Sequence, residues 1–479
     1  MKSRWRDAVT LSISNTLGGQ REPFAPLDGK NVKMYVCGMT PKREPHIGHA
    51  RLFVAMDMIR RYLAYQGYEV QHVQNITDVD DKIIAAAERE GVTPDEVAQM
   101  YTDAYDAVMG NLNVLRAHEF PKVTKTLPQI IAMIEGLIEK GAAYTAEEAV
   151  YFSVPGFAEY GALSTRTEES GIQAGASGRV DDEPGKRDPR DFALWKPAKP
   201  GEPWWQSPWG QGRPGWHIEC STMIYETLGE QIDIHGGGAD LIFPHHENEI
   251  AQSEAFTEKV PFTKYWLHTG LLTINGQKMA HSLGNFITIE DILKEYSGPV
   301  LRLYLLSVHY RSPLTYSSDS LDQARSGMAR LTGALRVQAG GSGSTDALLS
   351  QATQQAETGF FAAMDGDFNS AGALGQLYEL VREINRLGAE ARPSTLQAAQ
   401  ETLVNLADIL GIDLQEMLEA EMATGDGDAA GFIDLLVELR SDLRQEKQFA
   451  LADKVRDELA ALGIALEDTP AGTVWRRTS

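Results

Sequence analysis

Cysteine is scarce in this chain: Cys37 and Cys220 are the two that occur in 479 residues. Two thiols so far apart in the sequence make no disulfide framework, which excludes the small disulfide-stabilised class of secreted proteins. A reducing, cytoplasmic compartment is therefore the expected location. Both cysteines have histidine and glutamate residues close by in the sequence, which raises the question of a shared chemical role.

Long apolar runs are also lacking. No stretch reaches the roughly 18 residues that span a bilayer, and residues 1–7 hold no apolar core for a signal peptide. We therefore expect no membrane partner. The composition, 43% hydrophobic and 23% charged, is that of a soluble globular protein, and the length allows several domains.

Positive charge is in short supply. The chain holds 44 lysines and arginines against 67 aspartates and glutamates, for a net charge of −23. Such an acidic protein does not coat nucleic acid non-specifically, because the phosphates repel it. Binding of one particular RNA through local basic patches is compatible with this charge, since physiological salt screens charges beyond about 8 Å.

The first part of the chain predicts a doubly wound α/β fold. Residues 31–37 have the apolar character of a short buried strand, and residues 49–65 carry apolar side chains at helical spacing. Gly67 can end that helix, and residues 68–76 then alternate as a strand does. A strand–helix–strand unit predicts a parallel sheet, in which ligands bind beyond the carboxyl ends of the strands.

The remainder of the chain predicts further units. A strand is expected at residues 231–235, ending at three glycines, and the chain beyond residue 290 is predicted to be mostly helical. Two Gly-rich stretches, residues 339–344 and 424–428, are typical of flexible linkers. They delimit a helical segment at residues 345–420 and a small C-terminal unit at residues 430–479.

The two cysteines define a candidate metal site together with two later residues. His245 and Glu249 are four residues apart, so a helix would place them on one face. Two thiolates, an imidazole and a carboxylate make a zinc ligand set. Spacing alone slightly favours another interpretation, two buried apolar thiols and an ordinary helix start, because the chain has no C-x-x-C pair.

Two other motifs suit phosphate binding. His46 and His49 enclose a glycine in a turn between the first strand and helix, where the helix N-terminus favours an anion. Lys278, His281 and Ser282 follow a short apolar strand in a loop that also contains glycine. Taken singly, each motif is more often structural, a turn or a solvated loop.

Together these motifs resemble the signature pair of class I aminoacyl-tRNA synthetases, His-Ile-Gly-His and a later Lys-Met-x-x-Ser loop. Further motifs resemble cysteinyl-tRNA synthetases, and this similarity runs from about residue 20 to the last residues. The motifs are Asn75–Ile83, Gly215–Cys220, His235–Gly238, Phe243–Glu249 and Asp468–Arg477. Long motifs in this order are highly specific.

The resemblance implies a zinc-containing enzyme. It assigns the zinc ligands to Cys37, Cys220, His245 and Glu249, and it selects His245 over the neighbouring His246. A soft thiolate binds zinc well and a hydroxyl does not, so the metal would let the enzyme select L-cysteine over serine. The amino-acid pocket implied by the resemblance is formed by Gly38, Thr40, Thr77, Trp216, His235 and Asp240.

The implied reaction joins L-cysteine to ATP and then to the 3′ end of cysteine tRNA. The residues expected to hold ATP, with Mg²⁺ on its phosphates, are His46, His49, Lys278, His281 and Ser282. Asp468, Trp475 and Arg476 would contact the tRNA, and core packing is the alternative role for Trp475. The resemblance predicts a monomer.

The resemblance also predicts how the chain divides. A Rossmann-type, doubly wound parallel-sheet catalytic domain is interrupted by an insertion and followed by an α-helical bundle and a small anticodon-binding unit. The expected regions are the two halves of the catalytic domain at residues 20–120 and 211–275, a connective insertion at 121–210, a signature-loop and stem-contact region at 276–330, the bundle at 345–420 and the anticodon-binding unit at 430–479.

One loop departs from the family pattern. The usual Lys-Met-Ser-Lys-Ser reads Lys-Met-Ala-His-Ser here, so His281 stands where a second lysine is expected. Imidazole is mostly neutral at pH 7, and we therefore predict a slower or more pH-sensitive activation step. The segment after Thr40 also differs from the pattern, and Lys42 or Arg43 is a candidate source of the missing charge.

Two alternative functions use the same residues. A cysteine ligase of low-molecular-weight thiol synthesis would share the catalytic core and zinc ligands, but it would lack the C-terminal anticodon-binding unit. A synthetase paralogue that no longer charges tRNA would account for the altered signature loop. Pyrophosphate exchange separates the second alternative from an enzyme, and tRNA charging separates the first.

Overall fold

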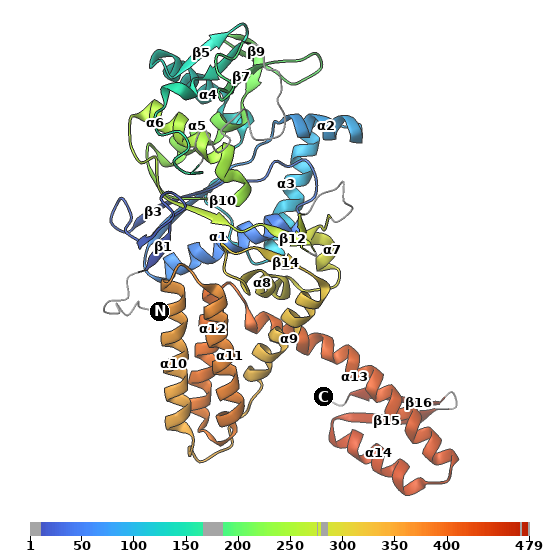
Figure 1. Ribbon diagram of the computed structural model, residues 1–479. Coiled ribbons are helices and arrows are strands. Elements are labelled where there is room, and N and C mark those ends of the chain that lie inside the picture. The colour runs from blue at the N-terminus through green and yellow to red at the C-terminus, as the bar shows by residue number, and fades with distance from the viewer. Residues whose placement is uncertain (1–10, 166–184, 275, 279–285, 470–471, 478–479) are drawn as a thin grey trace. The chain divides into compact units, whose positions relative to one another are not determined.

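The computed structural model describes residues 11–165, 185–274, 276–278, 286–469 and 472–477. The chain forms two compact units, Met1–Asp413 and Leu414–Ser479, each considered by itself (Figure 1). Among the described residues, no helix combines the length and the apolar character that crossing a membrane requires.

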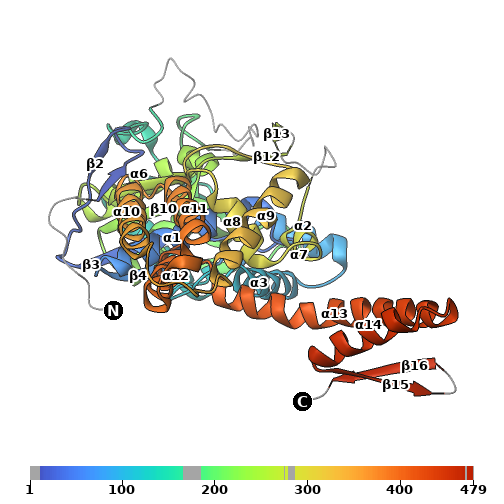
Figure 2. The same cartoon turned by 90° about the horizontal axis from the view of Figure 1, so that it is seen from below.

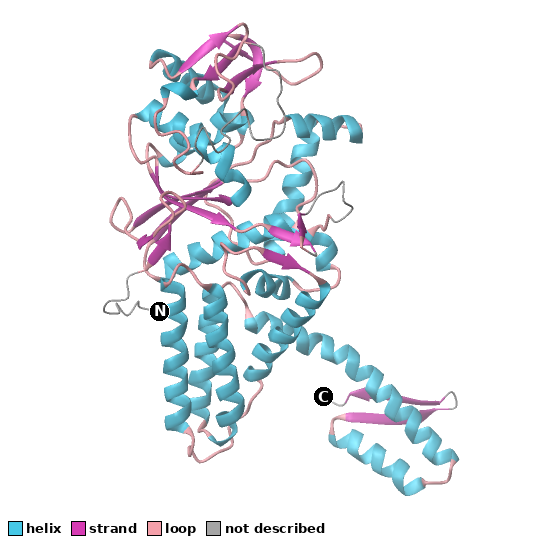
Figure 3. Ribbon diagram, viewed as in Figure 1, coloured by secondary structure: helices cyan, strands magenta, loops and turns pink. Residues whose placement is uncertain are grey.

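The first unit is built on a four-stranded sheet in the order β11-β10-β3-β4 (Figure 3). Its strands are β3 (Asn31–Val36), β4 (Glu69–Gln74), β10 (Ile232–Gly238) and β11 (Thr263–Thr269). All neighbouring strands are parallel, as predicted. Strand β4 pairs with one edge of β3, and β10 pairs with the other edge of β3. The strand order therefore reverses between β3 and β10, and a ligand crevice is expected at their carboxyl ends.

The predicted strand–helix–strand opening is confirmed. Helix α1 (Ile47–Tyr65) connects β3 to β4. The later strand was expected to end at three glycines, but β10 runs through Gly236 and Gly237 to Gly238. Position 236 favours glycine because α1 approaches the sheet closely there. A Cβ on Gly236 would lie 2.7 Å from Met56 Sδ.

The two faces of the sheet carry different partners because side chains alternate along a strand. Gly236 faces α1, whereas His235 points to the opposite face. Helices α5 (Trp216–Leu228) and α6 (Glu247–Thr257) cover that face. The buried core there comprises Tyr35, Cys37, Val73, Leu163, Cys220, Ile224, Leu228, Ile232, Ile250, Phe262 and Trp266. Both cysteines therefore belong to the layer between sheet and helices.

The connective segment carries a separate antiparallel sheet in the order β5-β6-β7-β9-β8. Its elements are α4 (Val123–Glu139), β5 (Ala143–Ala146), β6 (Ala149–Phe152), β7 (Phe192–Pro197), β8 (Trp205–Ser207) and β9 (Gly210–Pro214). Before it lie α2 (Asp81–Glu90) and α3 (Pro94–Asn111), and at the start of the unit β1 (Ser12–Ser14) pairs with β2 (Arg21–Pro23).

After the main sheet come a small sheet and a group of helices. The small sheet has the strand order β13-β12-β14. Its strands are β12 (Leu272–Ile274), β13 (Gln277–Lys278) and β14 (Leu314–Tyr316). The helices are α7 (Ile289–Leu293), α8 (Gly298–Leu306) and α9 (Ser318–Leu335). Residues 339–344, where the first linker was predicted, are irregular between α9 and α10, and Gly340 N and Gly343 N donate to the carbonyls of Ala389 and Glu390. The flexibility of this segment stays a prediction.

Three helices then pack side by side as a bundle, in both Figure 1 and Figure 2. They are α10 (Asp346–Asp365), α11 (Ser370–Leu387) and α12 (Pro393–Ile409). A buried arginine ties this bundle to the part of the unit that contains α1. Arg302 of α8 pairs with Asp57 of α1 and donates to the carbonyls of Leu410 and Leu112, at 2.8 and 2.9 Å. The end of α12 is thus fixed to α1.

The second unit consists of α13 (Leu414–Gln445), α14 (Phe449–Ala461) and a hairpin of β15 (Ile464–Thr469) and β16 (Gly472–Arg477). The linker predicted at residues 424–428 is wrong, because the backbone there lies inside α13. Two glycines cost only about 1 kcal/mol each in a helix, a small amount beside the length of this 32-residue element.

Candidate metal centre and nucleotide site

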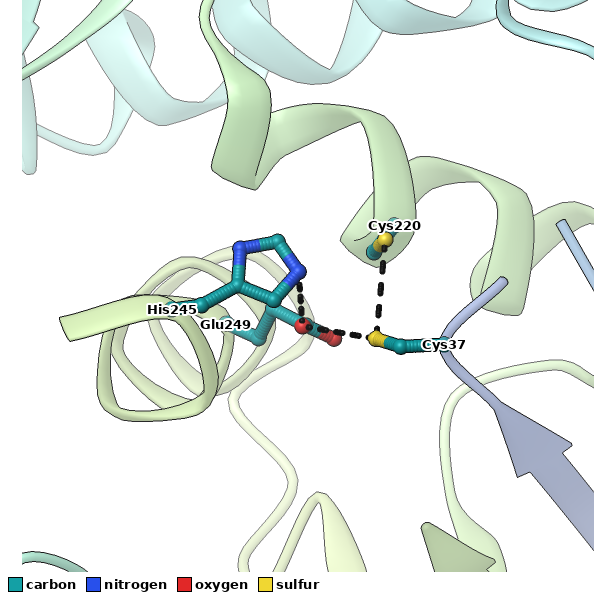
Figure 4. A group of neighbouring side chains, drawn as sticks. All are labelled: Cys37, Cys220, His245 and Glu249. Carbon is teal, nitrogen blue, oxygen red and sulfur yellow. Dashed lines mark hydrogen bonds and ion pairs between the residues drawn. The ribbon is translucent and has the colours of Figure 1, made fainter. Parts of the chain in front are cut away.

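Four predicted ligands converge behind the carboxyl end of β3 (Figure 4). Cys37 directly follows β3, Cys220 lies in α5, and Glu249 lies in α6. His245 belongs to the helical turn Ile242–His246 that leads into α6. All four are buried, and their ligand atoms lie within 4.8 Å of one another. Three remote segments therefore build one centre.

Two of the distances between these atoms fit a tetrahedral zinc ion. The two Sγ atoms are 4.0 Å apart, and Cys37 Sγ is 3.7 Å from Glu249 Oε1. Zn–S bonds of about 2.3 Å and Zn–O bonds of about 2.1 Å at tetrahedral angles would give about 3.8 and about 3.6 Å. His245 Nε2 lies 3.0 Å from Glu249 Oε1, an ion-pair distance shorter than the separation of about 3.4 Å expected between two tetrahedral zinc donors. The two distances that involve Cys37 Sγ are thus the ones that match a zinc ion.

A second group shares two of these donors. Cys37, His235, His246 and Glu249 also bring their ligand atoms within 4.8 Å. His246 Nε2 is 3.4 Å from Cys37 Sγ. Its ring sits directly over the backbone of β10, where a Cβ on Gly237 would meet Cε1 at 2.5 Å. The structure brings both histidines of the pair to the centre, so the assignment of His245 over His246 stays a prediction.

Further histidines orient both imidazoles. His217 Nδ1 lies 2.9 Å from His245 Nδ1, which leaves His245 Nε2 directed at Glu249. His246 Nδ1 lies 2.8 Å from His268 Nε2, and His268 Nδ1 lies 2.8 Å from the Thr16 hydroxyl. Outer contacts of this kind fix the tautomer and direction of a metal-binding imidazole.

Sequence reasoning did not identify His217 and His268 as part of the centre, and it weighed His246 only as the alternative to His245. His217 had a usable signal, because it precedes Cys220 by three residues and three-residue spacing places both on one helix face. His268 had none, since its position depends on the pairing of β11 with β10, where it sits opposite Gly237.

Electrostatics at the centre favour a bound cation. Burial, reinforced by the neighbouring Cys220 and Glu249, raises the pKa of the Cys37 thiol. Burial also opposes ionisation of Glu249, but His235 and His245 outweigh it and lower the Glu249 pKa to about 2. The His245 pKa rises to about 10 because Glu249 and Cys220 together outweigh the effect of burial. The hydrogen bond with Cys37 lowers the Cys220 pKa to about 6 against the opposing effect of burial. Glu249 and Cys220 thus carry negative charge that the proton on His245 balances in part, and a divalent cation in place of that proton would offset the charge.

Two predicted pocket residues contact this centre directly. The ring of Trp216 stacks on His245 at 4.1 Å between centroids. His235 Nε2 lies 2.8 Å from Glu249 Oε2, and its ring stacks on Trp266. Trp216 is partly exposed, whereas His235 is completely buried. Both side chains therefore shape the space around the four donors.

Gly38 and Thr77 meet through Asn75. The Gly38 amide donates to Asn75 Oδ1 at 2.7 Å, and Asn75 Nδ2 donates to the Thr77 hydroxyl at 3.1 Å. A Cβ at Gly38 would lie 1.8 Å from the Asn75 carbonyl oxygen, so only glycine fits. Thr40 is half-buried in the same loop, and Asp240 is exposed in the short turn Ala239–Leu241.

The two histidines of the first signature form the start of α1. His46 Nδ1 accepts from the Gly48 amide at 3.1 Å, and His49 Nδ1 accepts from the His46 amide at 3.2 Å. Their rings stack at 3.7 Å. Burial, together with His46, Lys42 and Arg43, holds the pKa of His49 well below its usual range. His49 is therefore neutral at pH 7, and its Nε2 is left to donate to an anion.

The chain that follows the second signature lies next to the first signature. The chain that emerges from the signature loop pairs with the start of α1: Ile47 N donates to Ile287 O at 3.3 Å, and Ile289 N donates to Pro45 O at 3.0 Å. The backbone of Lys278 lies in β13. His281 and Ser282 lie outside the described residues, so their predicted contacts with ATP stay predictions.

The predicted tRNA residues lie in the second unit. Trp475 is half-buried, packs on the core formed by Ile433, Leu459 and Ile464, and donates to Asp434 Oδ1 at 2.7 Å. Core packing was the alternative role for Trp475, and these contacts are of that kind. Asp468 and Arg476 lie on the hairpin strands, but their side chains are outside the described part. A role of all three in tRNA binding stays a prediction.

Comparison with known proteins gives a family for the whole chain. Residues 23–326 match the model of the class I (C) tRNA synthetase catalytic domain, and residues 359–415 match the DALR domain. A cysteine–tRNA ligase of Dehalococcoides mccartyi is 50% identical over 466 residues, 97% of this chain and 99% of that protein. One of Thermococcus gammatolerans is 47% identical over 487 residues, 98% of this chain and 99% of that protein.

A solved structure shares the fold. The methionyl-tRNA synthetase of Mycobacterium tuberculosis, in complex with methionyl-adenylate, superposes with a TM-score of 0.56 at 16% identity, over 85% of this chain and 94% of that chain. The same family is indicated by the parallel sheet, the two signatures, the buried thiol–histidine–glutamate centre and the relatives that match over nearly the full length. The chain belongs to the cysteine–tRNA ligase family of class I aminoacyl-tRNA synthetases.

Proposed function

We propose that this ligase activates L-cysteine with ATP and transfers it to the 3′ end of cysteine tRNA. The observation that carries the proposal is the buried centre of Cys37, Cys220, His245 and Glu249 at the switch point of the sheet, beside the stacked histidines of α1. Relatives named cysteine–tRNA ligase that match over almost the full length support the same reaction.

Zinc is the metal that the donor set suits best. Two thiols, an imidazole and a carboxylate at the observed separations match its preferred ligands and geometry. We assign Cys37, Cys220, His245 and Glu249 as the residues that hold it. Bound there, zinc would supply a soft Lewis acid that accepts a thiolate far better than the hydroxyl of serine.

The first chemical step needs positioning more than proton transfer. A carboxylate oxygen of cysteine attacks the α-phosphorus of ATP, the bond from that phosphorus to the bridging oxygen breaks, and pyrophosphate leaves with the electron pair. The nucleophile is already charged, so no general base is required. His46 and His49, held by the first turn of α1, would donate hydrogen bonds to phosphate oxygens. Mg²⁺ on the phosphates completes the proposal.

The second step moves the cysteinyl group to RNA. A ribose hydroxyl of the tRNA 3′ end attacks the carbonyl carbon of the adenylate, and AMP leaves with the bonding electrons while the hydroxyl proton passes to phosphate or solvent. His235, Trp216 and Gly38 surround the space in front of the centre and would orient the amino acid for both steps.

The alternatives have less support. A low-molecular-weight thiol ligase would not need the DALR match at residues 359–415 or the C-terminal unit of α13, α14 and the hairpin. A paralogue that no longer charges tRNA rests on the altered signature loop alone. We also propose a monomer in the cytoplasm, as expected from the family resemblance and from the two free, buried cysteines.

Cysteine-dependent exchange of labelled pyrophosphate into ATP tests the activation step. The purified chain with zinc should catalyse exchange with L-cysteine and not with L-serine at the same concentration. A chain that incorporates no label in the presence of L-cysteine, zinc and Mg²⁺ would overturn the proposed function. Labelled exchange without tRNA charging would instead favour the thiol-ligase alternative.

A further inference from the structure

Three cationic side chains, Lys42, Arg43 and Lys82, form a cluster near the start of α1. Lys42 and Arg43 stand half-buried in the loop that precedes α1, and Lys82 lies in the first turn of α2. In the described part of the chain, no carboxylate forms an ion pair with Lys42. Burial, then the charges of Lys82 and Arg43, lower the Lys42 pKa to about 8, and Asp80 offsets this only partly. The protein thus holds these cations together against their mutual repulsion.

The cluster faces both parts of the site. The Arg43 guanidinium lies 5.5 Å from the centroid of the Phe286 ring, and that ring packs edge-on against His46. Lys82 Nζ lies 5.9 Å from the ring of Trp216, which stacks on His245. Arg43 therefore lies beside the chain that leaves the signature loop and Lys82 beside the candidate metal centre, while Lys42 is close enough to both cations to feel their charges.

A polyanion is the ligand that such a cluster fits. Placing like charges close together is unfavourable by itself, but it becomes favourable when a group with several negative charges binds between the cations. In the proposed reaction one group acquires charge in this region, the pyrophosphate that leaves the α-phosphorus. The signature loop brings one lysine, Lys278, and one imidazole, His281. The signature loop therefore offers the pyrophosphate little permanent positive charge of its own.

We propose that Lys42 and Arg43, with Lys82 beside them, bind the β- and γ-phosphates of ATP and stabilise the pyrophosphate as it leaves. This inference rests on the proposed function, because it assigns residues to its first step. The bond changes are those of that step, and the cations supply charge without transferring a proton. Lys42 is the central member, since both other cations act on it.

Two variants and a control test the assignment. Lys42→Gln removes the charge, Lys42→Arg keeps it, and Lys259→Gln removes an exposed lysine outside the cluster. The readouts are the kcat of cysteine-dependent exchange, the KM values for pyrophosphate and cysteine, and the transfer of cysteine from isolated adenylate to tRNA. Thermal unfolding of each variant checks the fold.

We expect Lys42→Gln to lower the exchange kcat about tenfold to a hundredfold and to raise the KM for pyrophosphate. The KM for cysteine and the transfer step should stay within about twofold of the unmodified protein, the variation usual for an uninvolved group. Lys42→Arg should recover most of the rate, and Lys259→Gln should leave it unchanged.

Two results would overturn the inference: exchange by Lys42→Gln equal to that of the unmodified protein, or an equal loss in exchange and in transfer, which indicates a general structural role. Both leave the proposed function intact, because the unmodified chain still exchanges label. If the unmodified chain itself catalyses no exchange, the proposed function fails first and this inference fails with it.

Discussion

Replacement of Cys220 by serine is the sharpest perturbation of the candidate metal centre. Serine has nearly the volume of cysteine, so Cys220→Ser leaves the packing between α5 and the sheet close to intact. It exchanges a soft thiolate for a hydroxyl that does not ionise near neutral pH. The sulfur lies 4.0 Å from Cys37 Sγ, which is a separation that one zinc ion spans.

The size of the effect follows from the number of donors. The free energy of binding of a zinc ion held by four protein ligands is about 10–16 kcal/mol at pH 7. Shared equally, each ligand accounts for about 2.5–4 kcal/mol. At about 1.4 kcal/mol for each factor of ten, loss of one ligand should weaken zinc binding by about 10²- to 10³-fold.

Competition with a chromophoric chelator measures this change directly. Thr222→Ser is the matched control, since Thr222 is buried in the same helix and its hydroxyl donates to the Ile218 carbonyl. We expect the control to bind zinc normally, and Cys220→Ser to lose zinc and cysteine activation while it still binds ATP. Tight, stoichiometric zinc in Cys220→Ser, with full exchange activity, would show that Cys220 is not a zinc ligand.

Three more outcomes are expected. His217→Phe removes the group that orients His245, and zinc affinity in the chelator titration should fall about 10- to 100-fold; an unchanged affinity would exclude that role. His281→Lys should speed pyrophosphate exchange and flatten its dependence on pH between about 6 and 8, the range in which imidazole loses its charge; identical profiles would contradict the idea. Asp57→Ala leaves Arg302 buried without its carboxylate and should cost about 3–5 kcal/mol in urea unfolding; a loss below about 1 kcal/mol would show that the carbonyl contacts suffice.

Local patterns were enough to predict the opening of the sheet, but not the chemical type of the centre. Spacing alone slightly favoured two buried apolar thiols there, and the family resemblance supplied the zinc interpretation. The strand before Cys37 and the helix after His46 follow from hydrophobic periodicity, which depends on a few neighbouring residues. The His245–Glu249 face likewise follows from helical spacing. For these elements, the physical cause lies within a short stretch of chain.

Features that depend on distant segments were not predictable from such patterns. His268 reaches His246 only because β11 pairs with β10 in a register that no local signal encodes. The error at residues 424–428 had a local cause instead: the glycines at residues 425 and 427 cost only about 1 kcal/mol each in the long helix α13, less than a break requires. The close approach that makes Gly38 irreplaceable depends on Asn75, at the end of a neighbouring strand.

Aminoacylation of cysteine tRNA measures the proposed reaction itself. The zinc-loaded chain, supplied with ATP, Mg²⁺ and cysteine tRNA, should attach labelled L-cysteine to the RNA and should leave labelled L-serine free under the same conditions. A control tRNA with a different anticodon should accept little cysteine. Failure to charge cysteine tRNA, or equal charging with serine, would show that this chain is not a cysteine-specific tRNA ligase.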